Sequence, residues 1–139
     1  MKTTIKNQRG VAAVEFALIL FPLVLLVFGT IEFSTLLYDK AMITNASREG
    51  ARAGIVYSFP DRIADGEIVN VINTYCGDHM ISLGGDSSVS TTITRAGNAS
   101  GDTLTVRVSY IYNFLVLPNL MTSLSDGLLL QGETVMRLE

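Results

Sequence analysis

The sequence is poor in the residues that build most catalytic and metal sites. Its 139 residues include one cysteine, one histidine and no tryptophan. A single cysteine excludes a disulfide within the chain and a cysteine-rich zinc or iron-sulfur site. Cys76 and His79 form a C-x-x-H pair, but tetrahedral zinc needs four ligands and the sequence offers no second pair. A nucleophilic dyad of these side chains lacks an evident orienting group, so we expect no enzyme, no metal and no cofactor. Cys76 is then either a half-buried free thiol or the site of a disulfide between chains.

Charged residues are also scarce. They make up 17% of the chain, against about 25% in ordinary soluble proteins. Ten basic and thirteen acidic residues leave a net charge of -3, and a chain of this charge is not expected to bind nucleic acid. The hydrophobic content of 48% and the mean hydropathy of +0.39 predict instead that some segment lies in lipid or in a large interface.

The apolar excess lies near the N-terminus. Residues 11–31, VAAVEFALILFPLVLLVFGTI, hold a single charge, that of Glu15. A helix of this length covers roughly 31 Å, close to the hydrocarbon thickness of a bilayer. The preceding MKTTIKNQRG carries three positive charges and no acid, which favours a cytoplasmic N-terminus and an exported remainder. An uncleaved signal anchor fits better than a secretory signal peptide, whose apolar run is usually about 7 to 15 residues.

Glu15 is unexpected inside a membrane span. A carboxylate at mid-bilayer costs on the order of 2.5 to 3.5 kcal/mol, so it needs a partner. Cleavage between Gly10 and Val11 would create an α-ammonium four residues before Glu15, in a first helical turn that already favours negative charge. The ammonium of a neighbouring subunit would serve equally well, and Glu15 would then set the axial register between stacked apolar helices. Gly10 suits cleavage because its backbone is easily extended and approached.

These residues resemble the cleavage motif of type IV prepilins. That motif is a short basic leader ending in glycine, followed by four residues, a glutamate and an aromatic, here Gly10, Val11 to Val14, Glu15 and Phe16. The longer stretch RGVAAVEFALILFPLVLLVFGTIEF at 9–33, continued by NASREGARAG at 45–54, is similar to the TadE-like pseudopilins of tight-adherence (Tad) pilus systems. The ending GETVMRLE at 132–139 resembles the C-terminal strand that such proteins often carry.

The resemblance implies a minor pilin-like subunit of a Tad, or type IVb, adhesive pilus. A membrane aspartyl prepilin peptidase would cut after Gly10, leaving Val11 as the first mature residue. Glu15 would serve processing or assembly, and Phe16 would be the aromatic that follows it. The implied partners are this peptidase, other pilins and pseudopilins, the inner-membrane assembly platform and the lipid bilayer. The catalytic carboxylates belong to the peptidase, so this chain itself has no catalytic residue.

Helical patterning continues beyond the span. Apolar residues recur at helical spacing among polar ones and predict an amphipathic stalk helix: Phe33, Leu36, Leu37, Ala41 and Thr44. Pro22 predicts a kink or a local loosening within the span.

Small residues follow on one ridge of the stalk. Ala46, Gly50 and Gly54 fall at i, i+4 and i+8, which would let another helix or a sheet approach closely. The alternative is that the two glycines simply fray the end of the helix.

The remaining residues predict a small α+β head. After a turn at 57–61, apolar residues repeat at helical spacing between Asp65, a plausible N-cap, and Gly77, a plausible stop. Strands are predicted at 89–94, 104–114 and 128–138, and the middle one alternates apolar and polar residues. The apolar segment 115–127, broken by Pro118, is predicted to be an irregular loop that fills the core or touches a membrane or partner.

The predicted fold is therefore α+β, with a long N-terminal transmembrane and stalk helix, one short helix and an antiparallel sheet of about three strands. We divide the chain into a leader (1–10), a transmembrane helix (11–31), an amphipathic stalk (32–56) and a periplasmic or extracellular head (57–139). Two hypotheses follow. One is an inner-membrane pseudopilin that is processed after Gly10 and enters or primes a pilus. The other is an uncleaved, single-span anchored binding module with an exported head.

Overall fold

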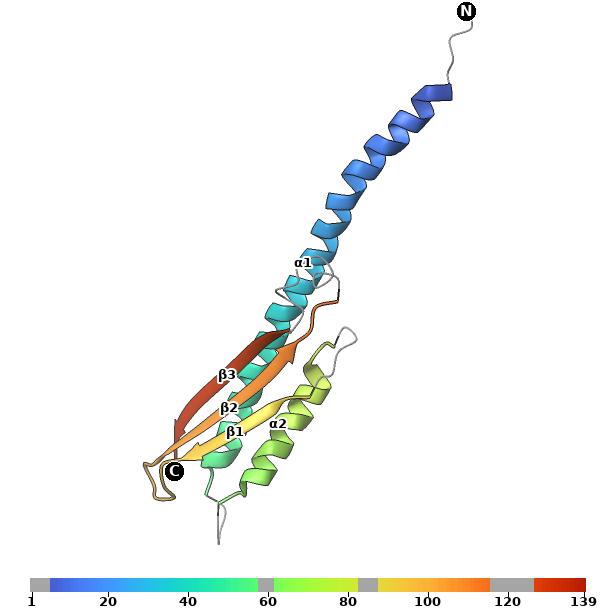
Figure 1. Ribbon diagram of the computed structural model, residues 1–139. Helices are drawn as coiled ribbons and strands as arrows, with labels where there is room; N and C mark the ends of the chain where they lie inside the picture. The colour runs from blue at the N-terminus through green and yellow to red at the C-terminus, as the bar shows by residue number, and fades with distance from the viewer. Residues whose placement is uncertain (1–5, 58–61, 83–87, 116–126) are drawn as a thin grey trace, which may run out of the picture.

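The computed structural model describes residues 6–57, 62–82, 88–115 and 127–139. It contains two helices and three strands, which are α1 (Lys6–Ile55), α2 (Asp65–His79), β1 (Ser90–Arg95), β2 (Thr103–Tyr112) and β3 (Leu128–Arg137). Figure 1 shows α1 projecting far beyond a head in which both helices lie on one face of the sheet. This arrangement confirms the predicted α+β fold.

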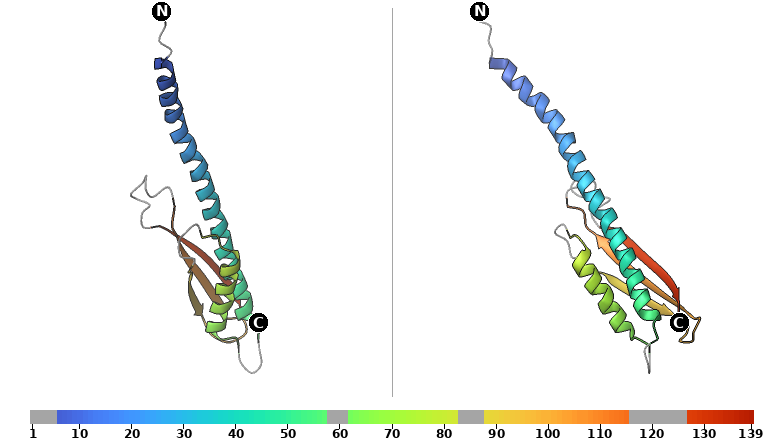
Figure 2. Two further views of the ribbon diagram at one scale, coloured as in Figure 1. Left: turned by 90° about the vertical axis from the view of Figure 1, so that its right-hand side faces the viewer. Right: turned by 180° about the vertical axis from the view of Figure 1, so that it is seen from behind.

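Helix α1 has a bare half and a packed half. Its 50 residues extend over about 75 Å, and none of the side chains from Gly10 to Ile31 is buried. Burial begins at Glu32, where α1 meets the head (Figure 2). The helix continues through Pro22, the predicted kink, without interruption and curves along its length. Among the described residues, α1 is the one helix that is long and apolar enough to cross a membrane.

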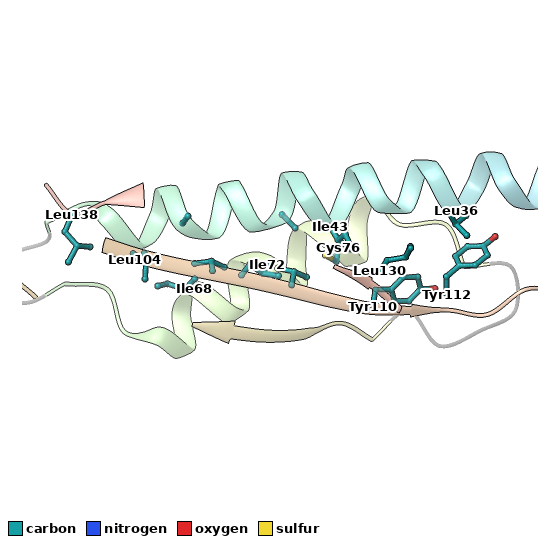
Figure 3. Packing of buried hydrophobic residues seen from close by; sticks show 14 residues of the cluster. Leu36, Ile43, Ile68, Ile72, Cys76, Leu104, Tyr110, Tyr112, Leu130 and Leu138 are labelled. Carbon is teal, nitrogen blue, oxygen red and sulfur yellow. The ribbon is translucent and has the colours of Figure 1, made fainter. Parts of the chain in front are cut away.

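The three strands form one antiparallel sheet in the order β1-β2-β3. Its register pairs Ile93 with Val106 and Val106 with Thr134. Strand β2 is buried along one face, at Leu104, Val106, Val108, Tyr110 and Tyr112, which confirms the predicted alternation. These side chains pack against both helices in a single core (Figure 3). The opposite face of β2 carries exposed side chains such as Arg107 and Ile111.

The stalk is helical as predicted, but its buried face differs from the expected one. Leu36 is buried, whereas Phe33, Leu37 and Ala41 are exposed. The buried face instead comprises Glu32, Leu36, Asp39, Ile43, Ala46, Ser47, Gly50, Ala51 and Gly54. Small residues recur on this face, and they allow the backbone of α1 to come close to the sheet and to α2. Close approach, rather than apolar periodicity alone, therefore decides which side of the helix faces inward.

Helix α2 differs from its predicted ends by a few residues. Its N-cap is Ala64, whose methyl side chain makes no cap hydrogen bond. Asp65 is the first helical residue, and its carboxylate accepts a hydrogen bond from Arg95 at 2.9 Å. The helix passes Gly77 and ends at His79, since the Met80 N–H still donates to the Cys76 carbonyl. The predicted turn at Ser58 to Pro60 and nearly all of the predicted loop at 115–127 lie outside the described residues.

The closest approach between α1 and the sheet is at Gly132 of β3. A Cβ atom at this position would lie 2.8 Å from the Ile43 carbonyl oxygen and 2.9 Å from the Thr44 Cα. Both are backbone atoms, so a rotamer change cannot make room for the added methyl group.

We therefore expect Gly132→Ala to force α1 away from β3 and to destabilise the head by about 1–3 kcal/mol. Thermal unfolding of the full-length protein in detergent, followed by circular dichroism, should show a midpoint several degrees lower. Gly66→Ala is the matched control, because nothing lies within 4 Å of a Cβ at this position on α2. Equal midpoints for the two variants would contradict the close packing of α1 on β3.

Candidate functional site

The residues of the predicted cleavage motif lie on the bare half of α1. Val11 and Phe16 are exposed, as are Gly10 and Glu15. Glu15 follows Val11 by four residues, so the two side chains share one face of the helix. None of the described residues of the head covers this face, and all four positions are exposed.

Gly10 is helical in the structure, since α1 begins at Lys6. Cleavage needs an extended and approachable backbone at this bond. A peptidase acting after Gly10 therefore has to unwind the first turns of α1. That step is inexpensive, because the first four N–H groups of a helix lack intrahelical partners and glycine costs about 1 kcal/mol in a helix interior.

The small residues of the stalk face the second helix and the sheet. Ala46 is fully buried. A Cβ atom on Gly50 would lie 2.6 Å from Ile72 Cδ1, and one on Gly54 would lie 2.5 Å from Leu104 Cδ2. The three positions therefore lie within the head, where they bring α1 against α2 and β2 of the same chain.

Two carboxylates on the stalk are buried at the end of the head from which the bare helix projects. Glu32 is 2% exposed and Asp39 is fully buried. They stand seven residues apart, two helical turns, and therefore on the same face of α1. A buried carboxylate is costly unless it accepts hydrogen bonds, so their partners indicate what they do.

Glu32 binds the segment that follows β2. Its Oε1 accepts a hydrogen bond from the Leu115 N–H, and its carbonyl oxygen accepts one from the Tyr112 hydroxyl at 3.2 Å. The same hydroxyl shares a 2.5 Å hydrogen bond with Thr35 Oγ1, and Figure 3 shows the Tyr112 ring beside Leu36 under α1. Burial raises the pKa of Tyr112, the hydrogen bond from Thr35 opposes this, and the Glu32 and Asp39 carboxylates raise it further.

Asp39 binds the segment that follows α2. Its Oδ1 accepts a hydrogen bond from the Ile81 N–H at 3.0 Å, while its Oδ2 is buried with no hydrogen-bond partner among the described residues. Burial raises the pKa of Asp39, and the hydrogen bond from Ile81 only partly opposes this effect. The two acids thus tie the ends of β2 and α2 to the stalk. Sequence reasoning placed them among solvent-facing positions, although their helical phase matches that of Gly50 and Gly54.

Cys76 and His79 do not form a reactive pair. Cys76 is 2% exposed and belongs to the core, and burial together with the nearby Asp39 carboxylate raises the pKa of its thiol to about 11. His79 is exposed, its ring stacks on Tyr75, and its Nδ1 lies 2.9 Å from the Tyr75 carbonyl oxygen. A buried thiol with few thiolate ions at neutral pH is poorly suited to a disulfide between chains.

A groove of about 420 Å³ lies at the other end of the head, among Tyr57, Arg62, Asp65, Arg95 and Asn98. Both of its arginines already bind backbone carbonyls. Arg62 donates to the Ile55 carbonyl at 2.7 Å and to that of Glu139. Arg95 donates to Asp65 and to the Ile63 carbonyl. These arginines hold the end of α1, the start of α2 and the end of the chain together.

An α+β head on a long helix with a bare apolar half defines the class of architecture, and the apolar half suggests a membrane anchor. Residues 10–52 match the model of the family described as TadE-like protein. This match over about a third of the chain confirms the resemblance drawn from the sequence, and it suggests a pilin-like protein associated with a Tad pilus. The chain matches no curated protein and no solved structure.

Because the pKa of Asp39 is raised, the stability of the fold should depend on pH in a testable way. The folded protein binds a proton at this carboxyl more tightly than the unfolded chain, whose aspartate titrates near 3.8. Protonation therefore stabilises the fold as the pH falls from 7 through the raised pKa. We expect the wild-type protein to gain stability relative to Asp39→Asn between pH 7 and pH 4, measured by thermal unfolding in detergent. If the unfolding midpoints of the two proteins change equally between pH 7 and pH 4, burial does not raise the pKa of Asp39.

Proposed function

We propose that this chain is a pseudopilin, a minor pilin-like subunit for the assembly of a Tad pilus. A prepilin peptidase removes residues 1–10 after Gly10. Residues 11–31 hold the mature subunit in the inner membrane with its N-terminus toward the cytoplasm and its head in the periplasm. The assembly platform then moves the subunit from the bilayer toward other pilins and pseudopilins.

One observation carries this proposal. The family match begins at Gly10, runs along the bare half of α1 and ends in the stalk. That half exposes apolar side chains such as Phe16, Leu18 and Phe21 on all sides, and no described helix or strand of the head lies over them. Such a surface is unstable in water and requires lipid or the helices of other subunits. A pilin subunit occupies both environments in turn.

Glu15 has a specific part in this mechanism. After cleavage, the α-ammonium of Val11 lies one helical turn before the Glu15 carboxylate, or next to the Glu15 of an adjacent subunit. Pairing the two charges lowers the cost of keeping a carboxylate among apolar groups. The same pair sets the axial position of one helix against the next, because apolar surfaces alone permit sliding.

The proposal assigns no catalysis to the chain. Burial and hydrogen bonding hold Cys76, Glu32 and Asp39 inside the head, where they support the fold. Chemistry on this chain is therefore performed by the peptidase, for which the chain is a substrate.

Processing can be tested directly. Co-expression with the cognate prepilin peptidase should yield a mature protein that begins at Val11, as read by N-terminal sequencing and intact mass. An inactive peptidase should leave the chain uncut, and so should Gly10→Leu, because a bulky side chain obstructs access to the bond. A mature protein that starts elsewhere would overturn the assigned site. An uncut chain beside an active peptidase would favour the anchored binding module instead.

If Glu15 acts only in assembly, its removal should impair pilus formation without impairing membrane insertion. Glu15→Ala should enter the membrane as well as the wild type, because removing a charge lowers the cost of insertion, yet piliation should fall strongly. Membrane fractionation and counts of pili by electron microscopy measure the two effects.

Glu49→Ala is the matched control for Glu15. Glu49 is a partly exposed carboxylate on the same helix that pairs with Arg52 at 2.6 Å, and an exposed pair of this kind contributes about 0–1 kcal/mol. Its loss should leave piliation unchanged. Normal piliation of the Glu15→Ala strain would rule out the register role.

A further inference from the structure

The first three turns of the stalk have the reverse of the polarity expected of a helix in water. From residue 32 to residue 41, both acids point into the head, while Phe33 and Leu37 are more than half exposed. Lys40 is the single exposed charge in this stretch, and its Nζ donates a hydrogen bond to the Gln131 carbonyl. A water-facing helix shows its charges outside. This stretch shows apolar side chains to its surroundings instead.

Exposed apolar side chains from three other segments lie at the same end of the head. Leu115 follows β2 and its N–H is bound by Glu32, and Ile81 follows α2 and its N–H is bound by Asp39. Ile111 and Leu129 face each other across β2 and β3, next to the pair formed by Tyr112 and Leu128. We name this set the apolar collar: Phe33, Leu37, Ile81, Ile111, Leu115 and Leu129, each at least 43% exposed.

The collar lies at the depth of a membrane surface. If residues 11–31 fill the hydrocarbon layer, Leu37 stands about 9 Å and Asp39 about 12 Å further along the helix axis. The headgroup layer extends about 5–8 Å beyond the hydrocarbon on each side, and helix tilt brings these residues closer still. Phe33, about 3 Å beyond the span, therefore lies inside the headgroup layer, while Leu37 and the Ile81 segment bound to Asp39 lie at or just beyond its outer edge.

The collar is present on opposite sides of the head. Phe33 and Leu37 lie outside the buried face of α1, while Ile111 and Leu129 lie on the face of the sheet opposite the one that packs against α1. A single partner docked on one side cannot cover both. A bilayer that surrounds the emerging helix can cover both, and the collar is continuous with the apolar surface of the span.

We propose that the head is seated on the membrane surface, with the apolar collar in contact with the lipid headgroups of the bilayer that holds the span. The proposal rests on the membrane anchoring described above and adds a second contact to it. In this position Glu32 and Asp39 hold the Leu115 and Ile81 segments against α1 near the membrane surface. Their own carboxylates stay buried inside the head, away from lipid. Seating also fixes the orientation of the head relative to the membrane before assembly.

Site-directed spin labelling of the full-length chain in phosphatidylcholine and phosphatidylglycerol vesicles tests the proposal. In a Cys76→Ala background, nitroxides are placed by Leu129→Cys and Val135→Cys. These positions share one strand and one face, and both native side chains are 57% exposed. The ratio of collision with oxygen to collision with a water-soluble nickel chelate should be several-fold higher at 129 than at 135.

A second pair, with one position on α1 and the other directly after its last residue, keeps the test independent of any one variant's folding. Leu37→Cys and Val56→Cys replace side chains that are 51% and 49% exposed, and we expect the lipid-like ratio at 37 only. Leu20→Cys, in the middle of the span, reports membrane insertion.

The outcomes separate this proposal from the proposed function. Equal water-like ratios at 129, 135, 37 and 56, with a lipid-like ratio at 20, would overturn the seating and leave the anchor in place. A water-like ratio at 20 as well would overturn both. A nitroxide at 129 shielded from oxygen and from nickel would place a protein there and would also overturn the seating.

Discussion

The close approach of α1 to the sheet is the constraint on which the rest of the head depends. Gly132 brings the β3 backbone against the backbone of α1 at Ile43 and Thr44, and Gly50 and Gly54 admit the ends of Ile72 and Leu104. A head of this size cannot bury a large core by itself. It depends on the half of α1 that it covers, so the anchor and the core share one helix.

The same contact explains why two acids are buried. The face of α1 that meets the sheet also carries Glu32 and Asp39, and each carboxylate accepts a backbone N–H from a segment leaving β2 or α2. These hydrogen bonds offset part of the cost of desolvation. The arrangement concentrates polar groups inside the head at the end where its outer surface is apolar, which is the reverse of an ordinary soluble protein.

The sequence predicted the elements well and their faces less well. The alternation along β2 and the unbroken apolar run of α1 are local signals, and both were confirmed. The buried side of the stalk was predicted wrongly at Phe33 and Leu37, because the close approach of α1 to the sheet and α2 selects the face that carries the small residues. The N-cap of α2 was also misassigned, since Asp65 is the first helical residue and its carboxylate accepts a hydrogen bond from Arg95. The roles of Gly10 and Glu15 stay predictions, because they depend on a peptidase and on neighbouring subunits beyond this single chain.

The continuity of α1 from the bare half into the head has a mechanical consequence. Helix α1 passes the start of the head at Glu32 without a break, and the head grips it over the next six turns. Pro22 removes one backbone hydrogen bond within the apolar half, but the helix is continuous from there into the head, so rotation of the lower span about its axis turns the head with it. A pull along the axis likewise lifts the head as one body. A force applied to the apolar half of α1 is therefore transmitted directly to the head, because no flexible segment separates the two.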